Sequence, residues 1–183
     1  MDILRGKTWR FGDDISTDTI LPSKWKIASF ELAELGKHAM EGADENFGKR
    51  VNQGDFIVAG TNFGCGSSRE QAPMALKGSG VRVIIARTFA RIFFRNCVNI
   101  GLYPLELDCE EGFFETGDEI QVDFTKRTVL NLTNGRHMEF VPLPRFLEEI
   151  FNAGGLKPFL KSGKSLVKLV EAQGPYTLGD DSI

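Results

Sequence analysis

The sequence predicts an α/β fold in which a mainly parallel α/β unit is joined to an antiparallel β-hairpin unit. Between residues 54 and 107, apolar runs alternate with helical stretches, the pattern of parallel strands connected by right-handed crossovers. After residue 118, apolar and polar residues alternate, and Asn134-Gly135 is a strong hairpin signal. With 183 residues and 42% hydrophobic content, the chain can form one cored domain, expected at 1–160, followed by an appendage at 161–183.

The individual elements follow from the spacing of apolar residues. Apolar runs predict strands at residues 56–59 and 81–86, and a further strand is expected at 103–107. A stretch of mixed polarity is expected to form a first strand at 7–11, alternation predicts strands at 119–124 and 128–132, and the Asn134-Gly135 turn leads into a strand at 136–141. Helical spacing with caps and glycine stops predicts helices at residues 29–40, 72–77, 88–96 and 144–152, and a partly helical stretch at 165–172. Ser29 is the expected cap of the first helix, and the polar residues 41–52 are expected to form a loop.

The helix expected at 88–96 has two different faces. Thr88 is its expected cap. The side chains expected to face the core are Phe89, Ile92 and Phe93. Arg91 and Arg95 lie four residues apart on one face, where they either extend a positive surface or pair with acidic loops, and the sequence leaves both open.

One loop, at 59–70, concentrates the groups that can carry chemistry. It follows a buried strand and holds three glycines within seven residues, which allow a close backbone approach to a ligand. It leads into a helix start, where free N–H groups and the helix dipole favour an anion. Ser67-x-x-Glu70 equally fits a structural capping box. Pro73 suits the first helical position and leaves 67–71 as an irregular turn, so an anion site and a structural turn both stay open.

Composition and motif spacing exclude several function classes. The loop lacks the lysine of a P-loop and the third glycine of a dinucleotide fingerprint. The balance of Lys+Arg 22 against Asp+Glu 25 gives a net charge of −3 with no basic block, so no nucleic-acid partner is expected. No apolar run approaches the ~20 residues that span a bilayer. The start lacks a signal-peptide pattern, so a cytoplasmic location is expected.

The cysteines do not form a recognisable metal motif. Cys65, Cys97 and Cys109 are too few and too irregularly spaced for an iron–sulfur or zinc site, and their odd number fits a reducing compartment. Cys65 lies in a glycine-rich setting that suits a nucleophile. The two histidines, His38 and His137, lie in no suggestive context, so a Cys–His hydrolase is a weak alternative.

Four segments in the same order resemble a known family. They are 11–18 (FGDDISTD), 43–47 (ADENF), 62–70 (NFGCGSSRE) and 89–96 (FARIFFRN). The chain resembles the small subunits of isopropylmalate dehydratase and homoaconitase and the swivel domain of aconitase, over roughly residues 3 to 160. The resemblance implies a swivel-domain-like arrangement of β/β/α layers.

The resemblance also implies an activity, a partner and a cofactor. The expected function is that of the small subunit of a two-subunit hydro-lyase that isomerises a substituted malate by dehydration and rehydration, first of all 3-isopropylmalate in leucine synthesis. The alternatives are a homoaconitase or another dehydratase of citramalate or dimethylmalate, and a non-catalytic carboxylate-binding module. A large subunit would carry the [4Fe–4S] cluster, so no metal or cofactor is expected in this chain. The substrate would be a small di- or tricarboxylate, and the isolated chain could form a homo-oligomer.

The site residues implied by the resemblance cluster in two loops. Ser67 would be the base that takes a proton α to a carboxylate, with Arg69 stabilising the alkoxide and Asp18 orienting a basic partner. Ser68 and Arg69 would grip a substrate carboxylate, Arg69 by two-point contact. Backbone N–H groups of the glycine loop would help to stabilise the alkoxide, and Gly66 would be a substrate-binding residue. Asp13 and Asp14, beside Asp18, are expected to stabilise the turn.

Residues 20–27 match the loop that distinguishes substrates in this family. Trp25 is its aromatic residue, but no arginine lies nearby, and Lys24 and Lys26 are the only cations. A lysine is a point charge and cannot reproduce a bidentate arginine clamp. The three residues are therefore either substrate contacts or two surface lysines flanking a packed tryptophan.

Overall fold

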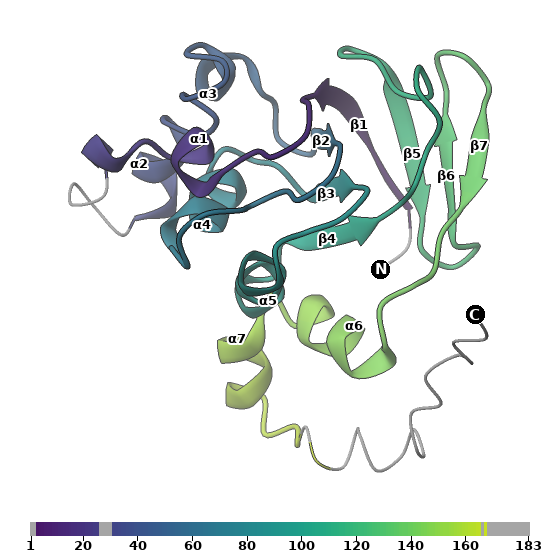
Figure 1. Ribbon diagram of the computed structural model, residues 1–183. Helices are drawn as coiled ribbons and strands as arrows, with labels where there is room; N and C mark the ends of the chain where they lie inside the picture. The colour runs from purple at the N-terminus through teal and green to yellow at the C-terminus, as the bar shows by residue number, and fades with distance from the viewer. Residues whose placement is uncertain (1–2, 26–30, 166, 168–183) are drawn as a thin grey trace, which may run out of the picture.

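A computed structural model describes residues 3–25, 31–165 and 167, which form one seven-stranded mixed sheet with flanking helices (Figure 1). The strands are β1 (Ile3–Arg10), β2 (Phe56–Ala59), β3 (Val83–Ala86), β4 (Tyr103–Glu106), β5 (Glu119–Asp123), β6 (Thr128–Asn131) and β7 (His137–Glu139). The helices are α1 (Thr17–Ile20), η1 (Ser23–Trp25, a 3-10 helix), α2 (Leu32–Gly36), α3 (Phe47–Arg50), α4 (Gln71–Gly78), α5 (Arg91–Ile100), α6 (Arg145–Asn152) and α7 (Leu156–Lys161). None of them is long and apolar enough to cross a membrane.

Strand β1 joins the two halves of the sheet. The order is β4-β3-β2-β1-β5-β6-β7. β1 runs parallel to β2, with Trp9 opposite Ile57, and antiparallel to β5, with Arg5 opposite Gln121. The strands from β1 to β4 on one side are all parallel, whereas β5, β6 and β7 are antiparallel hairpin strands. The predicted combination of a parallel unit and a hairpin unit is confirmed, and the two units share one strand.

Each of the two faces of the parallel strands packs against a separate hydrophobic core. In β2, Ile57 and Ala59 face the helices, whereas Phe56 and Val58 point to the opposite side. On that opposite side they join a cluster that includes Ile120 of β5, because the antiparallel half folds over the parallel half. The layers are therefore helices, parallel strands and antiparallel strands, as in the implied β/β/α arrangement (Figure 1).

The helix predicted at 29–40 is much shorter in the structure. α2 ends at Gly36, and the expected cap Ser29 lies outside the described residues. The chain leaves helical geometry because Met40 adopts a φ of 57° and donates its N–H to the Ile20 carbonyl at 2.7 Å. Gly36 packs so tightly on Gly78 of α4 that a Cβ would overlap the Gly78 backbone.

Four short helices were not predicted, namely α1, η1, α3 and α7. The stretch 41–52 contains α3, whose Phe47 is fully buried against Trp9. α7 follows α6 directly, and its Phe159 is fully buried in a small core with Val98 of α5. α3 and α7 are each only one turn or two long and bury a single aromatic side chain completely, a signal too sparse to show helical periodicity. Residues 166 and 168–172 of the stretch predicted at 165–172 lie outside the described residues.

Helices α4 and α5 differ from their predictions at their starts. α4 begins at Gln71, so Pro73 stands in the first turn, where its missing N–H costs no helical hydrogen bond. α5 begins at Arg91, and Thr88 is not its cap because its Oγ1 accepts the Asn62 N–H at 2.8 Å. The inward orientation predicted for Ile92 is wrong, since this side chain is 51% exposed.

Candidate active site

The glycine loop at 60–70 leaves the carboxyl end of β2 and is held by the loop that follows β1. Both loops emerge at one edge because β1 and β2 are neighbouring parallel strands. The Thr17 N–H donates to the Cys65 carbonyl at 2.8 Å, and the Thr61 N–H donates to Asp13 Oδ1 at 2.6 Å. This last hydrogen bond lowers the pKa of Asp13, because it stabilises the carboxylate. Asp13 thus stabilises the turn rather than contributing to the site.

Gly64 fixes the same loop to the start of α5. Its φ is 80°, and a Cβ at this position would overlap the ring of Phe93. The neighbouring residue Phe63 forms a parallel bridge with Phe89 and accepts the Ala90 N–H at 2.9 Å. The glycine loop is therefore held against the start of α5, by the backbone hydrogen bond at Phe63 and by the Phe93 side chain at Gly64.

Arg69 is the centre of a hydrogen-bond network. Its Nε donates to Ser67 Oγ at 2.8 Å, and its Nη2 lies 2.6 Å from Asp18 Oδ1. Its Nη1 donates to the Leu21 carbonyl at 3.2 Å and to Ser23 Oγ at 3.4 Å. The Arg69 side chain is only 11% exposed, whereas that of Asp18 is 60% exposed. All three guanidinium nitrogens already have partners, so the expected two-point grip on a substrate is not available unless Asp18 or Leu21 is displaced.

Ser67 Oγ has hydrogen-bond partners within the chain, yet the residue is exposed to solvent. Besides Arg69 Nε, Thr17 Oγ1 lies 3.2 Å from Ser67 Oγ and 3.4 Å from Arg69 Nη2. Gly66, Ser67 and Ser68 are exposed. The capping-box interpretation is wrong, because Glu70 is the N-cap residue of α4 and Ser67 bonds to Arg69 and Thr17 instead. The hydroxyl of Ser67 therefore projects from a polar, preorganised base into open space.

The predicted recognition loop is tied to a different part of the chain. Lys24 Nζ lies 2.6 Å from Glu41 Oε1, and Trp25 Nε1 donates to Glu41 Oε2 at 2.8 Å. Trp25 also stacks on His38 at 3.5 Å between ring centroids. Burial raises the pKa of Glu41, but the hydrogen bonds from Lys24, His38 and Trp25 together outweigh it and lower that pKa. Lys24 and Trp25 thus match the packed-tryptophan alternative, and Lys26 lies outside the described residues.

Three groups of the network were missed from the sequence. They are Thr17 Oγ1, Ser23 Oγ and the Leu21 carbonyl, all on or next to α1 and η1. Ser23 Oγ donates to Asp18 Oδ1 at 2.6 Å and so helps to hold the carboxylate that faces Arg69. Thr17 directly precedes Asp18, which is the one signal that could have drawn attention to it. No local pattern distinguishes a backbone carbonyl such as that of Leu21.

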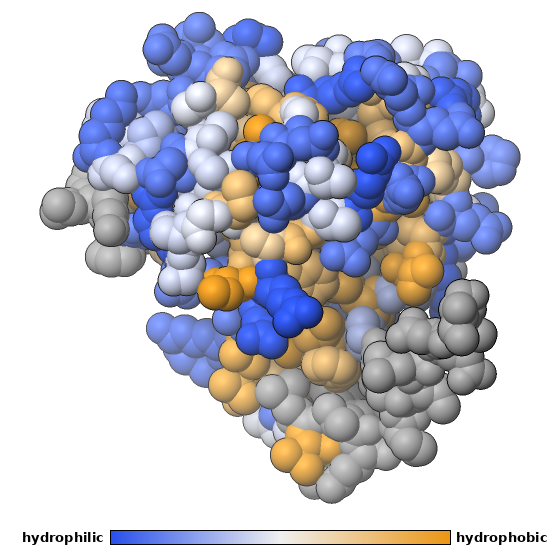
Figure 2. Space-filling model, viewed as in Figure 1, coloured by the Kyte–Doolittle hydropathy of each residue, from blue (hydrophilic) through white to orange (hydrophobic). Residues whose placement is uncertain are grey.

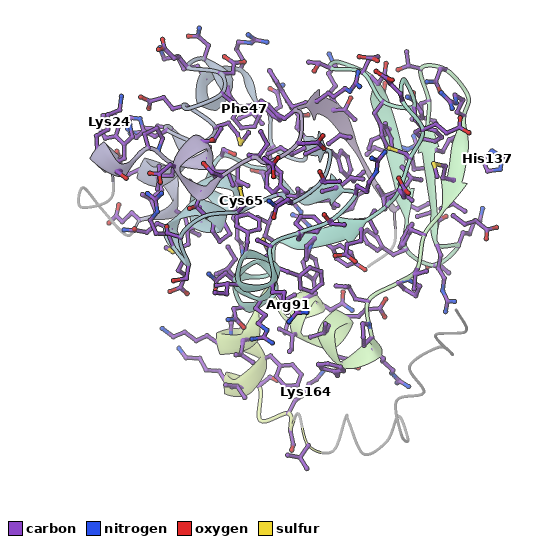
Figure 3. All side chains as sticks on the ribbon, in the orientation of Figure 1. Lys24, Phe47, Cys65, Arg91, His137 and Lys164 are labelled. Atoms are coloured by element: carbon purple, nitrogen blue, oxygen red, sulfur yellow. The ribbon has the colours of Figure 1, made fainter. Side chains whose placement is uncertain are left out.

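The cysteines and histidines do not form a second site within the described residues. Cys65 Sγ lies 3.5 Å from the Asp14 carbonyl, His38 stacks on Trp25, and His137 lies on β7 at the far edge of the sheet (Figure 3). Across the described ranges, no three His, Cys, Asp or Glu side chains are grouped so that they could hold a metal ion. The side chains described here therefore do not fit an iron–sulfur cluster.

The fold and the site together define a class: a mixed-sheet domain that presents a serine, supported by arginine, at an open edge. The Aconitase C-terminal domain family matches residues 15–110, and the chain belongs to this family. It is 51% identical over 158 residues to 3-isopropylmalate dehydratase small subunit 1 of Archaeoglobus fulgidus, covering 86% of this chain and 96% of that one. It is 46% identical over 163 residues to the 3-isopropylmalate dehydratase small subunit of Thermodesulfovibrio yellowstonii, covering 89% and 96%.

A solved structure matches the fold as well. The crystal structure of 3-isopropylmalate dehydratase from Methanocaldococcus jannaschii superposes with a TM-score of 0.83 at 40% sequence identity. The match covers 94% of this chain and 99% of that chain. Because the match extends over nearly all of both chains, it includes the antiparallel half, which lies beyond the residues matched by the family.

Proposed function

We propose that this chain is the small subunit of a 3-isopropylmalate dehydratase and acts in leucine synthesis together with a large subunit. The observation that carries the proposal is the 2.8 Å hydrogen bond from Arg69 Nε to Ser67 Oγ at an exposed edge of the sheet. The names of the relatives support the substrate and, through the words small subunit, the existence of a partner. A cytoplasmic location, expected for a biosynthetic enzyme, is part of the proposal.

Ser67 acts as the base in the proposed reaction. Its alkoxide removes a proton from the carbon next to a substrate carboxylate and becomes a hydroxyl, while hydroxide leaves the neighbouring carbon and a double bond forms. Rehydration with the positions exchanged gives the isomer. Hydroxide is a poor leaving group, and the Lewis acidity for its departure would come from the iron–sulfur cluster of the large subunit.

The network around Arg69 explains how a serine can serve as this base. A free serine hydroxyl is not ionised at neutral pH, so the alkoxide needs donors that are already in position. Arg69 Nε supplies a charged donor, and Thr17 Oγ1 is a second donor whose own oxygen accepts from Arg69 Nη2. Asp18 and the Leu21 carbonyl hold the guanidinium plane so that its Nε edge faces Ser67.

Ser68 and Gly66 are the proposed contacts to a substrate carboxylate. Both are exposed beside Ser67, whereas Arg69 is occupied within the chain. Arg69 then acts chiefly on Ser67, and its contribution to substrate affinity is secondary. Lys24 and Trp25 are proposed to affect substrate choice only through η1, whose Ser23 contacts Asp18.

The test is reconstitution with the large subunit of the same organism and an assay of hydration of isopropylmaleate. Ser67→Ala is expected to lower kcat by at least ~10³-fold, because the base is lost, while complex formation stays unchanged. Ser79→Ala, a matched change at the end of α4 away from the site, should leave the rate unaffected. Wild-type turnover by the Ser67→Ala complex would remove this serine from the base role.

A substrate panel separates the remaining alternatives. Faster turnover of a carboxymethyl- or methyl-substituted maleate than of isopropylmaleate would identify a homoaconitase or a citramalate-type dehydratase. Binding of a dicarboxylate without turnover in the reconstituted complex would identify a carboxylate-binding module. The names of the relatives at 51% and 46% identity favour isopropylmaleate over either alternative.

A further inference from the structure

Helix α5 turns a charged and apolar face to the outside. Its buried side chains are Phe93, Cys97 and Val98, which pack on the sheet and on α6. The opposite face carries Arg91, Ile92 and Arg95, all exposed, with Ile92 at 51%. We call these three residues the α5 face. In the view of Figure 2, hydrophobic atoms over α5 lie directly beside strongly hydrophilic ones.

The two arginines of the α5 face are not neutralised by the described part of the chain. Arg10, Arg87 and Arg136 each lie within 2.9 Å of a carboxylate oxygen. Arg91 and Arg95 have no ion pair or hydrogen bond there, which excludes the pairing with acidic loops that the sequence left open. Like charges four residues apart also weaken a helix. The fold therefore keeps an unfavourable pair of positive charges around an exposed apolar side chain.

The start of α5 lies next to the glycine loop of the candidate active site. The first turn of α5 is joined to the glycine loop through the Phe63–Phe89 bridge and the contact of Gly64 with Phe93. A partner that covers Ser67 would therefore lie close to the start of α5, where Arg91 and Ile92 stand.

We infer that the α5 face is a docking surface for the large subunit, which would present carboxylates on either side of an apolar pocket for Ile92. This inference rests on the proposed function for the identity of the partner. A second copy of this chain is a poorer occupant, because a two-fold contact would bring the arginines of one copy against those of the other. Nucleic acid is also a poorer occupant, because two arginines on a chain of net charge −3 make no basic track.

The test measures affinity for the large subunit with the full-length chain. Arg91→Glu and Arg95→Glu, singly and together, are expected to raise the Kd by about 10-fold or more, since each places a carboxylate against carboxylates of the partner. The salt dependence of binding should decrease in the double variant. Arg82→Glu is the matched control, because Arg82 is exposed and without an ion pair in the described residues but precedes β3 at the opposite edge. It should bind as the wild type does.

A second pair of variants tests the apolar centre. Ile92→Ala should weaken binding by about 5-fold or more, as expected for an apolar anchor in a pocket. Val141→Ala, at an 86% exposed position away from α5, should leave binding unchanged. If the double charge reversal impairs folding, Arg95→Gln removes one charge with less risk and should still raise the Kd by several-fold.

The possible outcomes separate this inference from the proposed function. Wild-type affinity in the double charge-reversal variant and in Ile92→Ala would overturn the docking surface, even if the complex turns over isopropylmaleate. A wild-type complex that forms, is weakened by the α5 variants and yet hydrates no maleate would support the docking surface and contradict the proposed function. Self-association that is lost in the same variants, without binding to the large subunit, would overturn the inference in favour of a second copy.

Discussion

Replacing Thr17 with valine removes a hydroxyl that would donate to the proposed Ser67 alkoxide and leaves the Arg69 donor in place. Thr17 Oγ1 lies 3.2 Å from Ser67 Oγ, whereas the charged Arg69 Nε lies at 2.8 Å. Loss of one preorganised donor to a developing oxyanion typically costs ~10²–10³-fold in turnover. Because the Thr17 donor is neutral and more distant, we expect the lower end, about 10²-fold in kcat.

The variant should fold and bind substrate normally. Thr17 is 1% exposed, and valine fills nearly the same volume, so the cost in stability is expected to be about 1 kcal/mol from lost hydrogen bonds. KM should stay near the wild-type value, because Thr17 is buried beneath Ser67. With one donor fewer, the alkoxide is less stabilised, so the pH at which activity rises should move upward.

The assay is steady-state hydration of isopropylmaleate by the reconstituted complex over a range of pH. Thr17→Ser keeps a hydroxyl and should recover most of the rate. A valine variant with wild-type kcat and an unchanged pH profile would refute the reasoning. Equal impairment of the serine and valine variants would also refute it, because packing rather than the hydroxyl would then be responsible.

Three further predictions follow from the same structure. Arg69→Lys should lower kcat by at least ~10³-fold, because one ammonium group cannot contact Ser67 and hold the same plane, whereas Arg136→Lys in an exposed ion pair should change steady-state rates little. Gly64→Ala should lower the free energy of unfolding, measured by urea titration, by about 2–4 kcal/mol, because it combines overpacking with a strained backbone. Gly112→Ala is the control, because Gly112 has a similar φ of 72° but no neighbour within 4 Å, so the free energy of unfolding should fall by only about 1–2 kcal/mol. If Gly64→Ala costs no more than this control, the overlap with Phe93 is contradicted. Burial raises the pKa of Tyr103 to about 12, above the value of about 10 for an exposed tyrosine. The folded protein therefore keeps the full contribution of the neutral Tyr103 to the free energy of unfolding below pH ~10 and loses it as the pH rises towards 12. Tyr103→Phe should remove this alkaline component in a pH series of thermal unfolding, and an unchanged series would contradict it.

The sequence by itself determined the elements in which several consecutive residues favour the same local structure. The apolar run that becomes β3 and the Asn134-Gly135 turn before β7 could each be assigned from neighbouring residues alone. Gly101 ends α5 with a φ of 73°, the left-handed conformation that glycine commonly adopts after a helix. The four ordered motifs also indicated the family and the side chains Ser67, Arg69 and Asp18 before any geometry was known. The strand, the turn and the helix end depend on short-range steric and hydrogen-bonding preferences, which a sequence displays directly, whereas the site side chains were implied by the resemblance.

Only the tertiary structure decided how the site is assembled and which surface remains open. The approach of the Leu21 carbonyl and Thr17 Oγ1 to Arg69 depends on the pairing of β1 with β2, which brings two distant loops to one edge. Ile92 and Phe93 are adjacent apolar residues, and helical spacing alone does not decide which one is buried. Packing of Phe93 against Gly64 decided it and turned Ile92 outward between two arginines. Sequence carries the local preferences, but the network and the α5 face arise from contacts between segments that the chain brings together only on folding.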